Sequence, residues 1–295
     1  MRSYNTKNWL EVFTFYKQDT LRMIWPMIVL IAIYTSGVDY WLSSKPEITG
    51  SPVMKNLTIM HSLLGLVISL LLVFRTNTAY DRWWEGRKLW GALVNNSRNL
   101  AMKLQALLPA EQIKHRNFFR KAIPLFAQAL DKHLKSPELE MSLDDHEHLE
   151  LNALNLKGHV PNQIATVIIK RCYELEKQGI ISQTQLLTLN PEISALSDIC
   201  GACERIKNTP IPFSYASFIK RFIILYIFTL PWSLASNLGF WSVPVVAFVF
   251  YALSSLEVIA EEIEEPFGTD PNDLPTDKIA GTIGKNIHDI IIPHH

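Results

Sequence analysis

Four stretches of the chain carry no charged side chain, and they alternate with segments that are rich in charge. They are residues 24–38, 57–74, 222–238 and 240–256. A helix needs about 20 apolar residues to cross a bilayer, and flanking Trp, Tyr and Leu residues extend each stretch toward that length. Buried helices of soluble proteins usually keep a polar stripe, which these stretches lack. The pattern therefore predicts transmembrane helices over residues 22–42, 57–74, 218–238 and 240–258.

Basic residues beside these spans predict the orientation of the chain. They are concentrated before the first span, after the second and before the third, at Lys7, Lys17, Arg22, Arg75, Arg82, Arg87, Lys88, Lys220 and Arg221. The loop of residues 43–56 has only Lys45 and Lys55. Because basic residues stay on the cytoplasmic side, this loop is expected outside the cell. Residues 1–21, 75–212 and 259–295 are then cytosolic.

Composition agrees with a membrane protein that has a large helical part outside the bilayer. The chain has 295 residues, of which 48% are hydrophobic, and its formal net charge is zero. A neutral chain gives no reason to expect a nucleic acid as partner. Within the cytosolic region, apolar residues recur at helical spacing over residues 90–108, 112–134 and 163–178. We expect Pro109, Pro137 and Pro161 to bound these helices.

Candidate catalytic or metal-binding residues are few. No nucleophile with a base, and no phosphate-binding loop, is evident, so an enzyme is not expected. The acidic and histidine-rich residues 144–148 favour a solvated loop over a metal site, because these residues are consecutive rather than four apart on one helix face. Cys172 stands alone, and Cys200 with Cys203 has no second pair to complete a zinc site, so packed thiols are expected.

The second span has an apolar stripe of its own. Leu66, Leu70 and Phe74 recur every four residues, and each step drifts by only about 40° around a helix. Beside them, small residues at positions 62, 65 and 69 would let another helix approach closely. In a ring of subunits the apolar stripe would meet its own copies around an axis. The alternative is a set of leucines that faces lipid or packs within a bundle.

Three blocks flanking the spans carry a resemblance to a known family. They are FRTNTAYDRWWEGRKLWGALVNNSR (residues 74–98), CERIKNTPIPFSY (203–215) and EEIEEPFGTDPNDLP (261–275). Together they resemble the bestrophin family in its bacterial branch, over nearly the whole chain. The resemblance implies an all-α membrane protein that assembles with itself as a homopentameric ion channel around a central pore. It also implies a bacterial inner membrane, with the lipid bilayer and small monovalent ions as partners and no required cofactor.

The resemblance assigns further roles to individual residues. Leu66, Leu70 and Phe74 match the family's pore neck, and Thr184, with Gln185 next to it, matches a second constriction at the cytosolic end. Some animal members bind calcium after a Pro-Phe-Gly sequence, where this chain has Asp270 and Asp273. Fewer carboxylates remain here than in those members, so a loop that ends a helix is favoured over a calcium site.

Charged and aromatic residues are expected at the junction with the cytosolic region. Glu257, Glu261 and Glu264, repeated around a ring, would give a negative potential that concentrates cations, unless they pair with Arg82 or Arg87. The choice between anions and cations therefore stays open. Trp83 and Trp84 point about 100° apart and are expected to pack between helices. A membrane-anchored scaffold or enzyme that binds a cytosolic partner is the alternative function.

Overall fold

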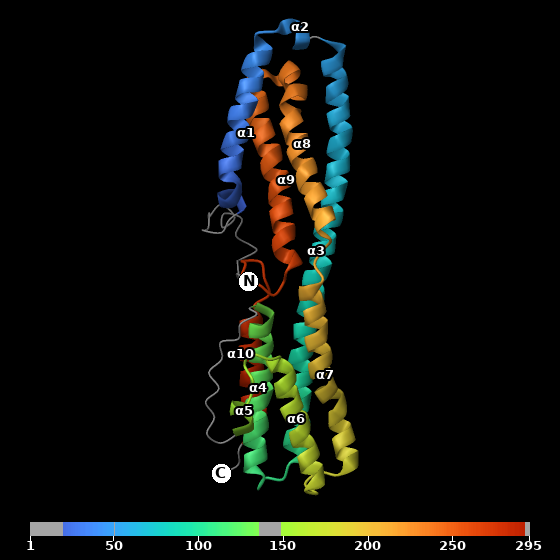
Figure 1. Ribbon diagram of the computed structural model, residues 1–295, viewed down its shortest axis with the longest axis vertical. Coiled ribbons are helices and arrows are strands. Elements are labelled where there is room, and N and C mark those ends of the chain that lie inside the picture. Colours follow the sequence, from blue (N-terminus) through green and yellow to red (C-terminus); the bar gives the residue numbers. More distant parts are fainter. Residues whose placement is uncertain (1–19, 50, 136–148, 293–295) are drawn as a thin grey trace. The chain divides into compact units, whose positions relative to one another are not determined.

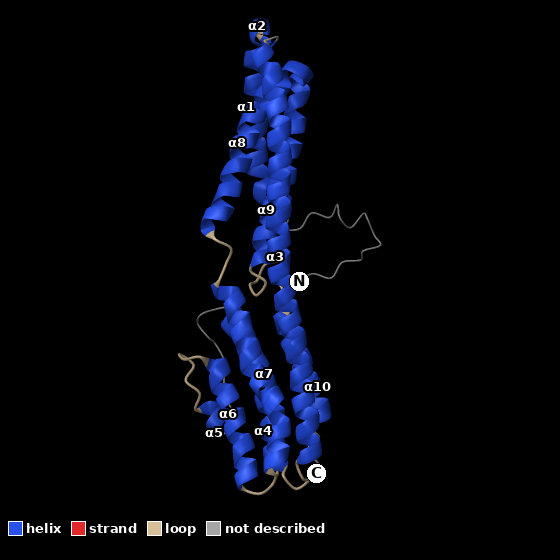
Figure 2. Cartoon of the chain, turned by 90° about the vertical axis from the view of Figure 1, so that its right-hand side faces the viewer, coloured by secondary structure: helices blue, strands red, loops and turns tan. Residues whose placement is uncertain are grey.

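The computed structural model describes residues 20–49, 51–135 and 149–292. Within these ranges all regular structure is helical, and no strand is present (Figure 2). The chain divides into two compact units. The first contains residues 1–82 and 210–264, and the second contains residues 83–209 and 265–295. Most of the N-terminal segment and the histidine-rich residues 144–148 lie outside the described residues.

The first unit is a bundle of long apolar helices (Figure 1). Its elements are α1 (Thr20–Ser43), α2 (Pro46–Thr49), the N-terminal part of α3 (Pro52–Leu107), α8 (Phe213–Leu238), the short 3-10 helix η2 (Gly239–Trp241) and α9 (Ser242–Glu264). Helices α1, α8 and α9 pack against one another. Ile68 and Leu72 of α3 join the core that α8 and α9 form with Ile223 and Val246.

Three segments of the described chain are long and apolar enough to cross a membrane. They are Thr20–Ser43, Pro52–Leu107 and Phe213–Glu264. The third segment contains both α8 and α9 with η2 between them, and Gly239 ends α8 at a φ of +52°. Little of each apolar stretch is buried within the chain, so a large apolar surface is left exposed.

Helix α3 has an apolar N-terminal part and a charged C-terminal part. It is one continuous helix of 56 residues, and it passes from the apolar run into the charged block at Arg75 without a break. The chain turns away only at Pro109, which cannot continue a helix. The predicted span of residues 57–74 and the predicted helix of residues 90–108 are thus parts of one helix.

The second unit is a helical bundle with its own core. It combines the C-terminal part of α3 with α4 (Ile113–Lys135), α5 (Leu149–Asn152), α6 (Val160–Lys177), α7 (Gln183–Asn208) and α10 (Thr276–Ile290). Helix α4 packs against α6, α7 and α10. Phe118, Phe119 and Phe126 of α4 are fully buried at the centre of this unit. Aromatic residues of this size contribute most of the apolar area that such a bundle buries.

Three helices of the second unit are additions to the sequence prediction, and one boundary is corrected. None of α5, α7 and α10 was expected as a helix, and α7 continues through Pro191. Helix α6 begins at Val160, so Pro161 lies in its first turn, where a proline costs no hydrogen bond. The helix ends at Lys177, and Gly179 beyond it takes a positive φ of 69°, which allows the Ile180 N–H to bond the carbonyl of Leu175.

The three cysteines are packed thiols, as the sequence predicts. Cys172, Cys200 and Cys203 are buried and form no disulfide. Burial raises the pKa of each thiol to about 12, so the reactive thiolate is scarce at neutral pH.

Candidate pore-lining face and ionic junction

The predicted neck residues form an exposed stripe on α3. Leu66, Leu70 and Phe74 are 68%, 56% and 57% exposed in the chain. Ile68 and Leu72, on the opposite side of the helix, are buried against the first unit's core. At about 100° per residue, the centres of the two faces lie roughly 180° apart. The apolar stripe therefore points directly away from the helices that hold α3 in place.

The small residues beside the stripe allow close helix packing. A Cβ on Gly65 would lie 3.0 Å from the phenol oxygen of Tyr226 in α8, which is a tight contact, so glycine lets this ring pack close to α3. The hydroxyls of Ser62 and Ser69 donate to the carbonyls of Thr58 and Gly65, four residues earlier. These hydroxyls are thus satisfied within α3, as a polar group in an apolar environment must be.

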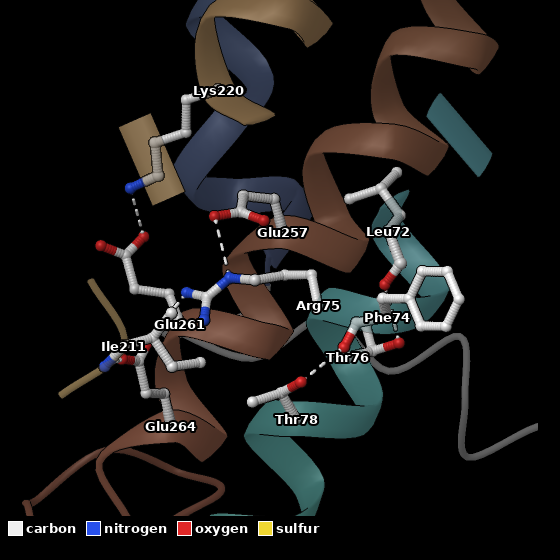
Figure 3. Close-up of polar contacts among 10 residues, drawn as sticks. All are labelled: Leu72, Phe74, Arg75, Thr76, Thr78, Ile211, Lys220, Glu257, Glu261 and Glu264. Carbon is white, nitrogen blue, oxygen red and sulfur yellow. Dashed lines mark hydrogen bonds and ion pairs between the residues drawn. The ribbon is translucent and has the colours of Figure 1, made fainter. Parts of the chain in front are cut away.

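An ionic junction joins α3 to α9 just beyond the apolar stripe (Figure 3). Arg75 is only 1% exposed, and its Nη2 lies 2.7 Å from Oε2 of Glu264. Its Nε lies 3.5 Å from Oε1 of Glu257, which is also buried. A guanidinium out of water requires such carboxylate partners, because an unpaired buried charge is costly. Arg75 therefore fixes the register between α3 and α9.

Further contacts involve Glu264 and the more exposed Glu261. The second carboxylate oxygen of Glu264 accepts a hydrogen bond of 2.6 Å from the backbone N–H of Ile211. Arg82 donates through Nε to the backbone carbonyl of Glu264 at 2.9 Å. Closer to the surface, Lys220 lies 2.8 Å from Glu261. The three glutamates expected to act as an acidic ring are thus each paired with a basic side chain, and the partners are Arg75 and Lys220.

In the second unit, the Pro-Phe-Gly loop packs on α3. A Cβ on Gly86 would lie 3.1 Å from the ring of Phe267, so the lack of a side chain at this position lets the ring pack close to α3. A Cβ on Gly268 would lie 2.7 Å from the Asp273 carboxylate. That carboxylate is buried and accepts a hydrogen bond of 2.6 Å from the Asp270 N–H. The candidate calcium residues therefore bond each other, which stabilises the loop.

The two tryptophans after the stripe differ in environment. Trp83 packs against the core of the second unit and donates its indole N–H to the carbonyl of Asn272, at 3.0 Å. Trp84 is 47% exposed in the chain. The two side chains therefore lie on different faces of α3, as their spacing requires.

Of the two aperture candidates, only Thr184 has an exposed side chain. Gln185 and Ser182 form a capping box at the start of α7, in which each side chain bonds the other's backbone N–H. Thr184, in the first turn, is exposed. Gln185 is thus used to begin the helix, and Thr184 stays the prediction for a pore-facing group.

Sequence reasoning missed several buried polar residues of the first unit. Arg75 served only as an orientation signal, although an arginine directly after an apolar run needs a partner, and this is the signal that could have found the junction. Asp39 of α1 is buried and accepts a hydrogen bond from Ser242 of α9. His61 of α3 is buried and bonds Thr229 of α8 at 2.9 Å.

Comparison with known proteins decides the family. Residues 1–289 match the model of the family described as bacterial/fungal bestrophin protein. The chain belongs to the bestrophin family. Among solved structures, this bestrophin is similar to a bacterial bestrophin homolog from Klebsiella pneumoniae, with a TM-score of 0.78 and 27% identity. The match covers 91% of this chain and 98% of that one.

Curated relatives carry names that state a function. The voltage-dependent anion channel-forming protein alr2987 of Nostoc sp. is 35% identical, over 96% of this bestrophin and 92% of the relative. The voltage-dependent anion channel-forming protein YneE of Escherichia coli K12 is 34% identical, over 75% of this chain and 73% of the relative.

Proposed function

We propose that this bestrophin is a homopentameric channel for small monovalent anions in the bacterial inner membrane. The observation that carries the proposal is the position of Leu66, Leu70 and Phe74 on α3. They are exposed and apolar, and they lie opposite the face that packs on the rest of the unit. Five copies arranged around an axis would bring this stripe together as a narrow hydrophobic neck.

The proposed topology has four spans and places both termini in the cytoplasm. Helices α1, α8 and α9 and the N-terminal part of α3 supply the spans, and the turn at η2 lies outside. The second unit is then cytosolic, with Thr184 of α7 at its aperture. A scaffold or enzyme anchored to the membrane remains the alternative, but the exposed stripe on α3 gives it no support.

Anions are favoured over cations by two observations. Curated relatives are named anion channel-forming proteins. In addition, Glu257 and Glu264 are engaged by Arg75, and Glu261 is engaged by Lys220, so these glutamates do not form an unpaired acidic ring. We further propose that Asp270 and Asp273 shape their loop, with no required cofactor at that position.

Two measurements test the proposed function. In detergent, light scattering or native mass spectrometry is expected to give five copies of the 33.7 kDa chain. In a planar bilayer with a chloride gradient, the reversal potential should move toward the chloride equilibrium potential. A monomer would contradict the pentameric channel, and a reversal potential at the cation equilibrium value would contradict anion selectivity.

Thiol labelling tests the aperture. We expect Thr184→Cys to be modified by a charged methanethiosulfonate reagent, and the current to fall at least about twofold, because a bulky charged group in a constriction impedes ions. The native protein is the control, since Cys172, Cys200 and Cys203 are buried and should not react. Complete labelling of Thr184→Cys with an unchanged current would place this side chain away from the pore.

A further inference from the structure

Three titratable side chains converge in the second unit from three different helices. His133 lies in the last turn of α4, His159 caps the N-terminus of α6, and Glu204 lies in α7. Oε1 of Glu204 is 2.7 Å from Nε2 of His133 and 2.5 Å from Nε2 of His159. The two imidazole centroids are 4.5 Å apart. Two nitrogen ligands and one carboxylate oxygen thus share one small volume.

From this convergence we propose a Zn²⁺ site formed by His133, His159 and Glu204. Two histidines and a glutamate are a ligand set that zinc binds with a solvent molecule in the fourth position. The three ligand atoms lie within 4.8 Å of one another. Bonds of about 2.0–2.1 Å in a tetrahedral site separate ligand atoms by about 3.3 Å. Small side-chain rotations are therefore enough to admit the ion.

The surroundings hold the ligands in place and leave access for the ion. Lys207 of α7 donates to the carbonyl of His133 at 2.8 Å, so the end of α4 is tied to the helix that carries Glu204. The three side chains are each about one quarter to one third exposed. His159 also lines a cavity of about 630 Å³ along α6, which provides a path for the ion and a place for the solvent ligand.

Zinc binding at His159 has a defined consequence for α6. Without metal, Nδ1 of His159 accepts a hydrogen bond of 3.1 Å from the Asn162 N–H, so the imidazole proton sits on Nε2 and faces Glu204. When Nε2 binds zinc, that proton moves to Nδ1 through solvent, and the bond to Asn162 is lost. No net proton is released by His159. The ion therefore joins α4, α6 and α7 while it removes the cap of α6.

Calorimetric titration with ZnCl₂ tests the site on the purified oligomer in detergent, in a His294→Ala/His295→Ala background that removes the terminal histidines. We expect one Zn²⁺ per chain.

Glu204→Gln and His133→Gln should each weaken zinc binding by about 100-fold or more. Loss of a residue that only supports a metal ligand typically costs about 10- to 100-fold in affinity, and loss of the ligand itself should cost no less. His159→Asn should weaken zinc binding equally while preserving the cap, because asparagine is a good N-cap residue. His288→Asn in α10 is the matched control and should bind zinc normally.

Thermal melts separate loss of ligation from loss of folding. Without metal, His159→Asn should melt as the parent does, and saturating ZnCl₂ should raise the melting temperature of the parent but not of this variant. The proposal is overturned if the parent binds no zinc at millimolar concentration, or if His159→Asn and Glu204→Gln bind it as tightly as the parent. These readouts do not depend on channel activity.

Discussion

Arg75→Gln is expected to destabilise the protein strongly, by about 3–5 kcal/mol, because it leaves the buried carboxylates of Glu257 and Glu264 without their cation. A loss of this size should lower the melting temperature of the purified protein by roughly 5–15 °C. It should also reduce the fraction recovered as an intact oligomer, since α3 loses its fixed register against α9. Melting in detergent and size-exclusion chromatography measure these two effects.

Lys220→Gln is the matched control for this prediction. It also removes a cation from an ion pair, at 2.8 Å from Glu261, but both side chains are about half exposed. Exposed pairs contribute only about 0–1 kcal/mol, so the melting temperature should move by a few degrees at most. Glu257→Gln combined with Arg75→Gln should recover part of the loss, because one of the uncompensated charges is removed. Equal melting temperatures for Arg75→Gln and Lys220→Gln would show that burial of the junction contributes no stability.

The triple variant Leu66→Ala/Leu70→Ala/Phe74→Ala is expected to conduct at least about twice the single-channel current of the parent. Three apolar rings in a narrow pore favour a dry state, and smaller side chains widen and hydrate it. Stability should change little, because all three side chains are more than half exposed in the chain and contribute little to its core. Single-channel recording in planar bilayers measures the current.

A control for this variant removes similar apolar volume elsewhere. Val29, Leu30 and Ile33 of α1 are also exposed, at 47%, 59% and 68%. Their replacement by alanine should leave the single-channel current unchanged, because α1 is not proposed to line the pore. An unchanged current in the α3 variant, with the oligomer intact, would remove Leu66, Leu70 and Phe74 from the neck.

The long helices could be predicted from the sequence because their signal is local. A charge-free run of 15 or more residues does not depend on distant partners, so each predicted span lies within or beside a helix. Helices α7 and α10 were missed because their apolar patterns are interrupted or short. Pro191 interrupts the pattern of α7, and α10 has only 15 residues. The capping box at Ser182 and Gln185 was the available signal for the start of α7.

The candidate site was only partly predictable. Helical periodicity alone places the three apolar residues of the stripe on one face of α3. The partner of each charge could not be predicted, because Arg75 and its carboxylates are distant in sequence and meet only when α3 packs on α9. Sequence reasoning named Arg82 and Arg87 as possible partners of the glutamates, whereas Arg82 donates to the Glu264 backbone. His133, His159 and Glu204 were missed because helix packing, rather than spacing, brings them together.

The burial of Arg75 has a consequence for the order in which the protein is made. Glu257 and Glu264 are near the end of α9, so they leave the ribosome long after α3 has been synthesised. Until then the guanidinium has no carboxylate from this junction, and water is its best partner. In the proposed topology, the C-terminal end of the apolar run is therefore expected to stay at the membrane surface until α9 has been made. Packing of α3 against α9 is then expected to be a late step of folding.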